Sequence, residues 1–185
     1  MSLWGNDIKP KNLTDAEKKE VYATKQGWVR EAGSILSGNG NTSADPEVLV
    51  AISNLSANMG SANITELEFI TTSFDKSDGG TLQVRARFNE PVTVTGTPQL
   101  TVVNDSRANH TLSYASGSTT NELVFSLTID AANAATNAGD VLSIGANAMS
   151  LNGGTVKDTN ESGTNATITN VASIGAAAGT ITVSA

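Results

Sequence analysis

The sequence predicts a mainly β protein whose body is a β-sandwich, and three observations lead to this fold class. Residues 81–104 contain two short segments in which apolar and polar side chains alternate, as they do along a half-buried strand. Turn-forming residues separate these segments from each other and from their neighbours. Hydrophobic residues make up 38% of the chain but aromatic residues only 4%, which suits thin β-layers better than a large α/β core.

The central segment sets the expected strand boundaries. In residues 81–88 the apolar side chains are Leu82, Val84, Ala86 and Phe88, and the polar ones are Gln83, Arg85 and Arg87. We expect this strand to end near Asn89, because Pro91 cannot donate a backbone hydrogen bond to a neighbouring strand. Gly96 and Pro98 then form a second break, and residues 99–104 read as the next strand.

The remaining strands of the body follow from the same patterns. We expect them at residues 66–74, 111–115, 122–129, 141–144, 148–151, 155–157 and 166–168, with a turn at Asp78-Gly79. The expected core is Leu82, Val84, Phe88, Leu100, Val102, Leu123, Phe125, Leu127 and Leu151, with Arg85 and Arg87 on the outer face. The tail, residues 171–185, contains a further strand at 180–183, which we expect to be donated to the exposed edge of a neighbouring subunit.

Three motifs in this region resemble bacterial immunoglobulin-like repeats. They are FNEPVTVTGTPQL from residue 88, YASGSTTNELVF from residue 114 and LNGGTVKD from residue 151, and they occur in the family's order. The resemblance covers residues 66–170 and implies an immunoglobulin-like β-sandwich over about residues 64–170. It says little about function, because this fold serves unrelated roles.

Charge and composition narrow the possible functions. The net charge of −7 argues against nucleic-acid binding, and no run of residues is apolar enough for a membrane span. The chain has no cysteine, and its first residues lack the apolar core of a signal peptide, so we expect neither disulfides nor Sec export. Residues 1–31 hold six Lys/Arg against five Asp/Glu, whereas residues 32–185 hold five against thirteen. This asymmetry suggests two regions with different surroundings.

Residues 1–60 are expected to form an extended N-terminal arm with one short helix. Thr14 and Glu17 have the spacing of a capping box, which predicts a helix at about residues 15–23. Residues 47–52 read as a strand that could pair with residues 28–29. The arm would attach the protein to a partner, and the side chains expected to make the contact are Trp4, Tyr22, Trp28, Lys18 and Lys19.

A second resemblance concerns this N-terminal region. MSLWGN, a K-P-K, a Lys/Glu-rich segment with VYAT, and then GWV and EVLVA resemble the N-terminal part of virion structural proteins of marine tailed phages, many of which infect cyanobacteria. The match covers about the first 55 residues. It implies a component of a virus particle without saying which component.

Residues that could carry chemistry are few. The only histidine, His110, falls in a predicted loop and has no partners for a catalytic triad or a metal site. Loop oxygens that could bind calcium are those of Asp75, Asp78, Asp140, Asp158, Asn160 and Glu161. Their spacing matches no calcium-binding motif, so we interpret them as solvated turn residues and expect no metal, no cofactor and no enzymatic activity.

The function expected from the sequence is therefore a phage virion structural protein. Within this class we favour a capsid decoration or cement protein on the head surface, anchored to the major capsid protein or other virion proteins by residues 1–60. We expect it to be a homo-oligomer in the particle, with no nucleic-acid or membrane partner. The alternatives are a neck, tail or fibre component, or a cell-surface adhesion module.

Overall fold

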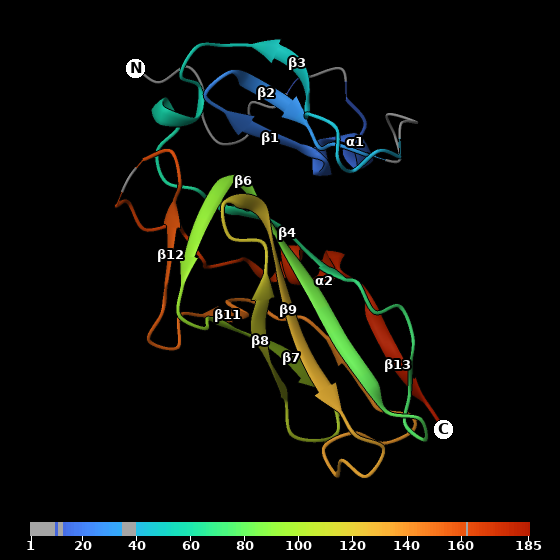
Figure 1. Cartoon of the computed structure of the whole chain (residues 1–185). Helices are drawn as coiled ribbons and strands as arrows, with labels where there is room; N and C mark the ends of the chain where they lie inside the picture. The colour runs from blue at the N-terminus through green and yellow to red at the C-terminus, as the bar shows by residue number, and fades with distance from the viewer. Residues whose placement is uncertain (1–9, 11–12, 35–39, 162) are drawn as a thin grey trace.

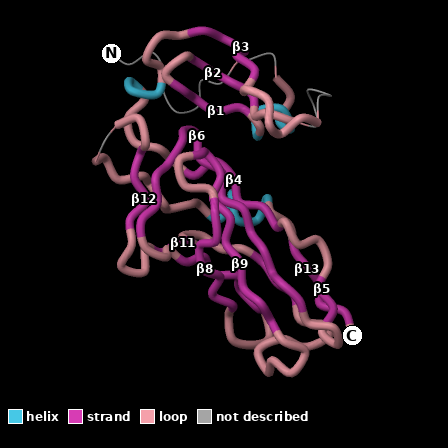
Figure 2. Tube along the Cα trace, viewed as in Figure 1, coloured by secondary structure: helices cyan, strands magenta, loops and turns pink. Residues whose placement is uncertain are grey.

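Strands dominate the structure, a computed structural model that describes residues 10, 13–34, 40–161 and 163–185 (Figures 1 and 2). The chain is divided into two parts. A small N-terminal unit consists of the described residues between 13 and 59. A larger β-sandwich consists of the described residues from 62 to 185, and the N-terminal unit lies at one end of it (Figure 1).

The N-terminal unit is a three-stranded antiparallel sheet in the order β1-β2-β3. Its elements are α1 (Asp15–Lys19), β1 (Val21–Thr24), β2 (Gly27–Arg30), β3 (Glu47–Ala51) and a 3₁₀ turn (Ser56–Asn58). The predicted strand at residues 47–52 is confirmed, and so is its pairing with β2, since Trp28 pairs with Val50 and Val29 with Val48. Buried Val21, Ala23, Trp28 and Leu55 form a core separate from that of the β-sandwich.

The helix is shorter than the sequence predicted. The capping box is present, because the Thr14 N–H donates to Glu17 Oε2 at 2.8 Å and the Glu17 N–H donates to Thr14 Oγ1 at 3.3 Å. The prediction of a helix over residues 15–23 is nevertheless wrong, since Val21 to Thr24 form a strand that alternates between buried and half-buried residues. A helix of one turn is marginal on its own, and sheet pairing with β2 prevails. The described part of the expected arm is therefore a folded sheet.

The β-sandwich is built from one sheet that curls around its own core. Its elements are β4 (Ile64–Phe69), β5 (Phe74–Asp75), β6 (Gly80–Thr95), β7 (Gln99–Asn104), β8 (His110–Ser116), β9 (Thr120–Ile129), β10 (Val141–Ser143), β11 (Met149–Ser150), β12 (Thr155–Asp158), α2 (Ala172–Ala177) and β13 (Thr180–Ser184). The strand order is β12-β6-β9-β8-β7-β10-β13-β5, with β4 also paired to β6 and β11 to β7. Two layers thus face each other across the core, which fits a β-sandwich.

The longest strand, β6, passes through the proline that was expected to end it. Its first half pairs with β4 and β9, and after a bulge between Arg87 and Val92 its second half pairs with β12. Pro91 lies in this bulge, where the Thr159 N–H donates to its carbonyl oxygen at 3.1 Å. The missing N–H of Pro91 costs little at a bulge, and the prediction that the strand stops near Asn89 is therefore wrong.

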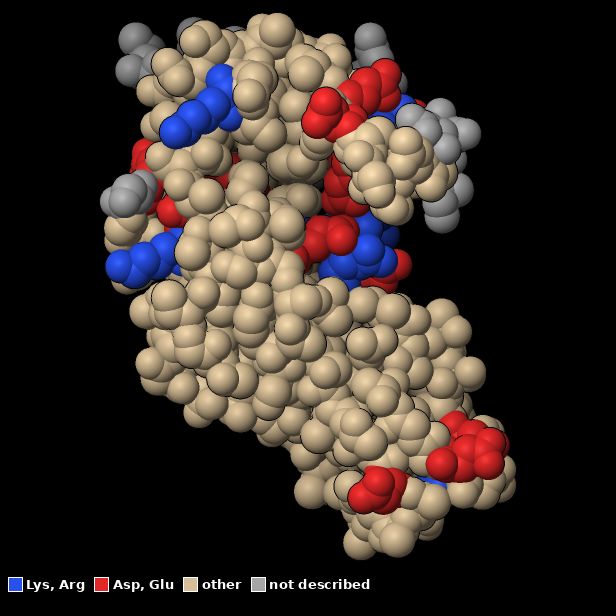
Figure 3. All heavy atoms as spheres, in the orientation of Figure 1, with Lys and Arg blue, Asp and Glu red and all other residues tan. Residues whose placement is uncertain are grey.

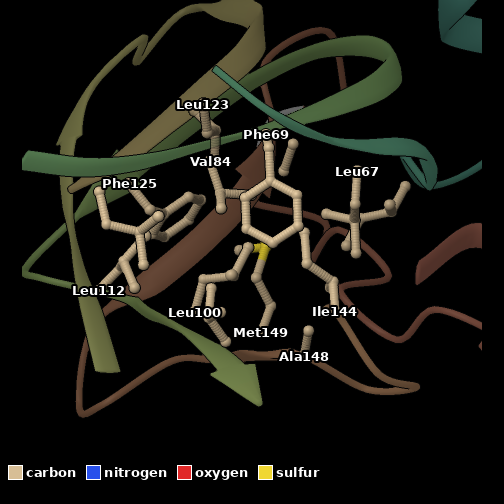
Figure 4. Packing of buried hydrophobic residues seen from close by; sticks show 14 of the residues in the cluster. Leu67, Phe69, Val84, Leu100, Leu112, Leu123, Phe125, Ile144, Ala148 and Met149 are labelled. Carbon is tan, nitrogen blue, oxygen red and sulfur yellow. The ribbon is translucent and has the colours of Figure 1, made fainter. Parts of the chain in front are cut away.

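The core joins the two layers directly. Figure 4 shows Phe69 and Val84 facing Leu100 and Met149 from the opposite layer. The ring of Phe125 packs edge-on against the ring of Tyr114, with ring centres 6.2 Å apart. Of the expected core, these side chains are buried: Leu82, Val84, Phe88, Leu100, Val102, Leu123 and Phe125.

Four expectations for the body are corrected, and one of them is the strand at residues 166–168, where the structure has only an isolated bridge between Asn63 and Thr167. Leu151 is 39% exposed and Leu127 only partly buried, because Leu151 falls just past the two-residue strand β11 and turns outward. The expected strand at residues 66–74 is interrupted and forms β4 and β5. The C-terminal strand β13 is not donated to another subunit, since it pairs with β10 and β5 of its own chain.

Phe125→Ala is expected to lower the free energy of unfolding by about 3–5 kcal/mol, because Phe125 is fully buried between the layers and its removal leaves a cavity. The matched control, Leu151→Ala, should cost under about 1 kcal/mol, since that side chain already reaches solvent. Urea unfolding of both variants measures the difference. Similar costs for the two substitutions would contradict the packing described here.

Candidate functional site

The N-terminal unit meets the β-sandwich over a group of charged side chains. Strand β1 contacts β6, which bends beneath the N-terminal unit (Figure 1). Figure 3 shows positive and negative side chains gathered at this junction, whereas the middle of the β-sandwich face in that view carries neither. We call five of these residues the charge network: Glu31, Glu66, Arg85, Arg87 and Glu122.

Arg87 is the centre of the charge network. Its side chain points away from the core, as the alternation in β6 predicted, but the N-terminal unit covers it and leaves the residue 8% exposed. Its Nη1 donates to Glu66 Oε2 at 2.9 Å, and its Nε donates to Glu122 Oε1 and lies 3.7 Å from Glu31 Oε1. One guanidinium therefore contacts carboxyl groups from three separate segments of the chain.

Two further contacts tie the N-terminal unit to the β-sandwich. Lys19, at the end of α1, places its Nζ 2.7 Å from Glu66 Oε1 on β4. Asn121 on β9 donates through Nδ2 to Glu31 Oε1 at 3.1 Å. Because Glu31 follows β2 directly, these contacts fix both the helix and the sheet of the N-terminal unit to the outer face of the β-sandwich.

The charge network holds more carboxyl groups than guanidinium groups, and this excess shifts the pKa values of Glu31 and Glu122 in opposite directions. Burial and then the nearby carboxylate of Glu122 raise the pKa of Glu31 to about 7, although Arg87 opposes this shift. Burial opposes ionisation of Glu122 as well, but its hydrogen bond and attraction to Arg87 outweigh burial and lower the pKa of Glu122. Docking of the two parts is therefore most favourable when Glu31 holds a proton and Glu122 does not.

A second buried carboxylate lies where the connection between the two parts enters the β-sandwich. Glu90 on β6 is fully buried, and its Oε2 has no hydrogen-bond partner among the described residues. Burial, followed by repulsion from Asp158 and Glu161, raises the pKa of Glu90 to about 8. Asp158 in turn accepts a hydrogen bond from the Ala62 N–H at 3.1 Å, so this acidic region holds the incoming segment.

The hollows around these groups are small. A hollow of about 170 Å³ beside the charge network is lined by Lys19, Thr65, Glu66, Ser173, Ile174 and Ala177. Small-molecule sites usually have volumes of about 300–1,000 Å³. The arrangement is therefore suited to holding two parts of the chain together rather than to binding a ligand of that size.

The side chains predicted to anchor the protein are mostly used inside the chain. Trp28 is 2% exposed in the core of the N-terminal unit, so its expected place in an intermolecular interface is corrected. Tyr22 faces the β-sandwich, where burial and then Glu31 and Glu122 raise its pKa. Lys19 bridges to Glu66, and Lys18 lies half-buried in the last turn of α1. Trp4 lies outside the described residues.

The N-terminal unit instead presents strand β3 to its surroundings. Val48 is 51% exposed and Val50 is 40% exposed, whereas Leu49 between them packs against the core of the unit. Strand β3 is paired on one side with β2, and among the described residues no strand pairs with its other side. We call this outer side of β3, with Val48 and Val50, the β3 edge. It lies far from the β-sandwich (Figure 1).

Several of the residues considered for calcium or catalysis have structural hydrogen-bond partners. Asp75 accepts hydrogen bonds from Ser77, and Asp158 from the N–H groups of Asn160 and Glu161. His110 was expected in a loop but is the first residue of β8. It is buried with Nε2 3.0 Å from Thr136 Oγ1, and burial lowers its pKa. In the part of the chain that the structure describes, no group of three His, Asp or Glu side chains is arranged to hold a metal ion.

The charge network escaped the sequence analysis because its members are far apart in the chain. Alternation placed Arg85 and Arg87 on the outer face, and that placement is correct relative to the β-sandwich core. The register of β6 against β9 pairs Arg87 directly with Glu122, a cross-strand ion pair that a predicted register could have suggested. Nothing in the sequence indicates that Glu31 covers this pair.

Comparisons with known proteins identify no relative. No protein-family model, no curated protein and no solved structure matches this chain. Among the described residues, no helix is both long and apolar enough to cross a lipid bilayer.

Arg87→Met is expected to lower the free energy of unfolding by about 3–5 kcal/mol, because it leaves buried carboxylates without their counter-ion. Arg85→Met is the matched control on the same strand face. Its side chain is 27% exposed, so its loss should cost about 1 kcal/mol or less. Urea unfolding measures both, and hydrogen exchange should accelerate in residues 13–34 of Arg87→Met only. Equal effects of the two variants would contradict the central role of Arg87.

Glu90→Gln should remove a pH dependence of stability. Because the pKa of Glu90 is raised from 4.5 to about 8, the folded protein binds this proton more tightly than the unfolded chain does. As pH rises from about 5 to about 8, the wild type should therefore lose on the order of 3 kcal/mol of stability through Glu90. The variant should lack this loss and keep only the part that arises from Glu31, whose pKa is also raised. Urea unfolding from pH 5 to pH 9 tests this. If the free energies of unfolding of variant and wild type differ by the same amount at every pH, Glu90 titrates normally.

Proposed function

We propose that this protein is a structural component of a phage particle, attached through its N-terminal unit, with the β-sandwich projecting from the attachment point. Within the particle we favour a decoration or cement protein on the head surface. The observation that carries the proposal is the β3 edge, at the end of the molecule away from the β-sandwich (Figure 1). Two valines are exposed there, and no strand of the described residues pairs with the outer side of β3. Such edges are ready to pair with another chain.

The resemblances in the sequence supply the class of protein. The N-terminal resemblance to virion proteins covers the part of the chain that carries the β3 edge. The immunoglobulin-like resemblance supports assigning the β-sandwich to that fold, since its motifs fall on connected elements of the sheet. YASGSTTNELVF spans the β8–β9 hairpin, and LNGGTVKD runs through the turn into β12. We propose the immunoglobulin-like assignment on this basis.

The charge network gives the proposal a physical basis. A projecting domain is positioned only if it is fixed to its attachment unit, and Arg87, Glu31 and Lys19 provide that connection through buried or short contacts. Attachment of many copies to a symmetric lattice makes weak individual contacts sufficient, because each bound copy raises the effective concentration of the next contact. A neck, tail or fibre location would give far fewer copies per particle than a head lattice, so the copy number in purified particles decides between them.

The double variant Val48→Lys/Val50→Lys is expected to reduce occupancy of particles that lack the protein by at least about tenfold, since charged side chains on a strand edge block pairing and apolar contact. The matched control is Ile70→Lys/Val171→Lys, which places the same charges at two exposed apolar positions of the β-sandwich. Binding of purified variants to such particles is measured by sedimentation. If the control variant binds the particles less well and the β3 variant binds them normally, the contact surface lies on the β-sandwich.

A further inference from the structure

We propose that the junction between the two parts of the chain is a proton-dependent joint. While Glu31 holds a proton, the N-terminal unit stays docked on the β-sandwich as in Figure 1. When Glu31 ionises, the unit is released and changes its orientation, with both parts still folded. This inference goes beyond the proposed function and does not depend on it, because every contact involved lies within one chain.

The two parts have separate apolar cores, and polar side chains meet between them. Buried apolar residues form one cluster in the β-sandwich and another in the N-terminal unit. The contacts that join the parts include the ion pair of Lys19 with Glu66 and the hydrogen bond from Asn121 to Glu31. Each part therefore keeps its own core when the contact between them is lost.

The connection between the parts contains a suitable hinge. Gly60 follows the 3₁₀ turn with a φ of +92°, and apart from its chain neighbours no atom lies within 4 Å of the position that a Cβ would take. Beyond it, Ala62 is buried and fixed, since its N–H donates to Asp158 and its carbonyl oxygen accepts from the Thr167 N–H at 2.7 Å. A rotation about Gly60 therefore changes the orientation of the N-terminal unit without disturbing the β-sandwich.

Carboxyl groups outnumber cations at the junction. The charged or titratable side chains around Glu31 are Arg85 and Arg87 on β6, Glu66 and Glu68 on β4, Glu122 on β9, Tyr22 on β1 and Lys19 at the end of α1. With Glu31 included, four carboxyl groups thus meet three cations. The adjacent Arg30 pairs with Glu17 and Glu47 instead, and Glu20 accepts a hydrogen bond from Ser34. Protonation of one carboxyl group removes the excess charge from this partly buried site.

Glu31 is the carboxyl group that carries this proton. Arg87 donates hydrogen bonds to Glu66 and Glu122, whereas Glu31 Oε1 lies 3.7 Å from its Nε. Burial and then repulsion by Glu122 raise the pKa of Glu31 from 4.5 to about 7. After release Glu31 is solvated and titrates near its ordinary value, so the docked state binds the proton more tightly. The contribution of this proton to docking is complete below about pH 4.5 and is lost as pH rises through about 7, which lowers the docking equilibrium constant by about 300-fold.

Release leaves the charges of the β-sandwich with partners. Arg87 keeps Glu66 and Glu122, which both belong to the β-sandwich, and it regains contact with water when the N-terminal unit leaves. Arg85 likewise keeps Glu68 and Glu122. The released state therefore buries no uncompensated charge, and the joint closes again when Glu31 regains its proton.

Single-molecule fluorescence energy transfer in the full chain tests this joint, since the natural chain has no cysteine that would take up a dye. The dyes are attached through Val48→Cys in the N-terminal unit and Val171→Cys in the β-sandwich, two exposed positions. One narrow distribution of transfer efficiency is expected at about pH 5, and a second, broader one should grow as pH rises to about 8. In the same labelled chain, Glu31→Gln should keep the narrow distribution at every pH. Its amide does not ionise but still accepts the hydrogen bond from Asn121.

Matched variants identify the group responsible. Glu47→Gln changes an exposed carboxyl group of the same unit and should open as the wild type does, and so should Glu90→Gln. Circular dichroism should stay unchanged during opening, because both parts remain folded. A single narrow distribution of the wild type at every pH overturns the proposal. Opening of Glu31→Gln at any pH, or loss of the β-sheet signal during opening, overturns it as well.

Discussion

The burial of Arg87 among four carboxyl groups, those of Glu31, Glu66, Glu68 and Glu122, is the constraint on which the arrangement of this protein depends. A guanidinium on the outer face of a sheet would ordinarily be solvated, but here the N-terminal unit covers it. Once covered, it cannot remain without counter-ions, and Glu66 and Glu122 of the β-sandwich supply them. Glu31 of the N-terminal unit contacts the same guanidinium, with a raised pKa. Such a buried network adds little net stability, because burying its charges is costly. It does define how the N-terminal unit docks, because another orientation would leave a buried charge without its counter-ion.

The two acidic residues with raised pKa values, Glu31 and Glu90, both lie at the junction of the two parts. The excess of carboxylates in the network raises the pKa of Glu31 to about 7, and the pKa of Glu90 at the connection is about 8. Both acids lie where the two parts of the chain meet, so ionisation at alkaline pH acts first on the junction and leaves the apolar core of the β-sandwich untouched. The stability of the contact between the two parts and the protonation of Glu31 and Glu90 are thus linked at the junction.

Much of the fold could be predicted from local patterns. The alternation in β6, β7 and β9 placed Leu82, Leu100 and Phe125 in the core, since side-chain direction in a strand depends only on residue parity. The paired segments at Trp28 and Val50 were also predicted correctly. Predictions from local sequence patterns were wrong where pairing with another strand decided the secondary structure. Pro91 did not end its strand because it falls at a bulge in the β6–β9 pairing and β12 pairs with the residues that follow it. The second half of the predicted helix over residues 15–23 became a strand because β2 pairs with it.

The sequence by itself determined that this is a mainly β protein with two regions of different charge, no disulfides and few residues suited to catalysis. Only the tertiary structure decided which side chains meet. It buried Trp28 in a small core of its own and left Val48 and Val50 exposed. It also brought Glu31 to Arg87 across 56 positions of the chain. Burial and ion pairing between distant segments depend on how separate sheets pack, and residue spacing along one strand carries no record of that packing.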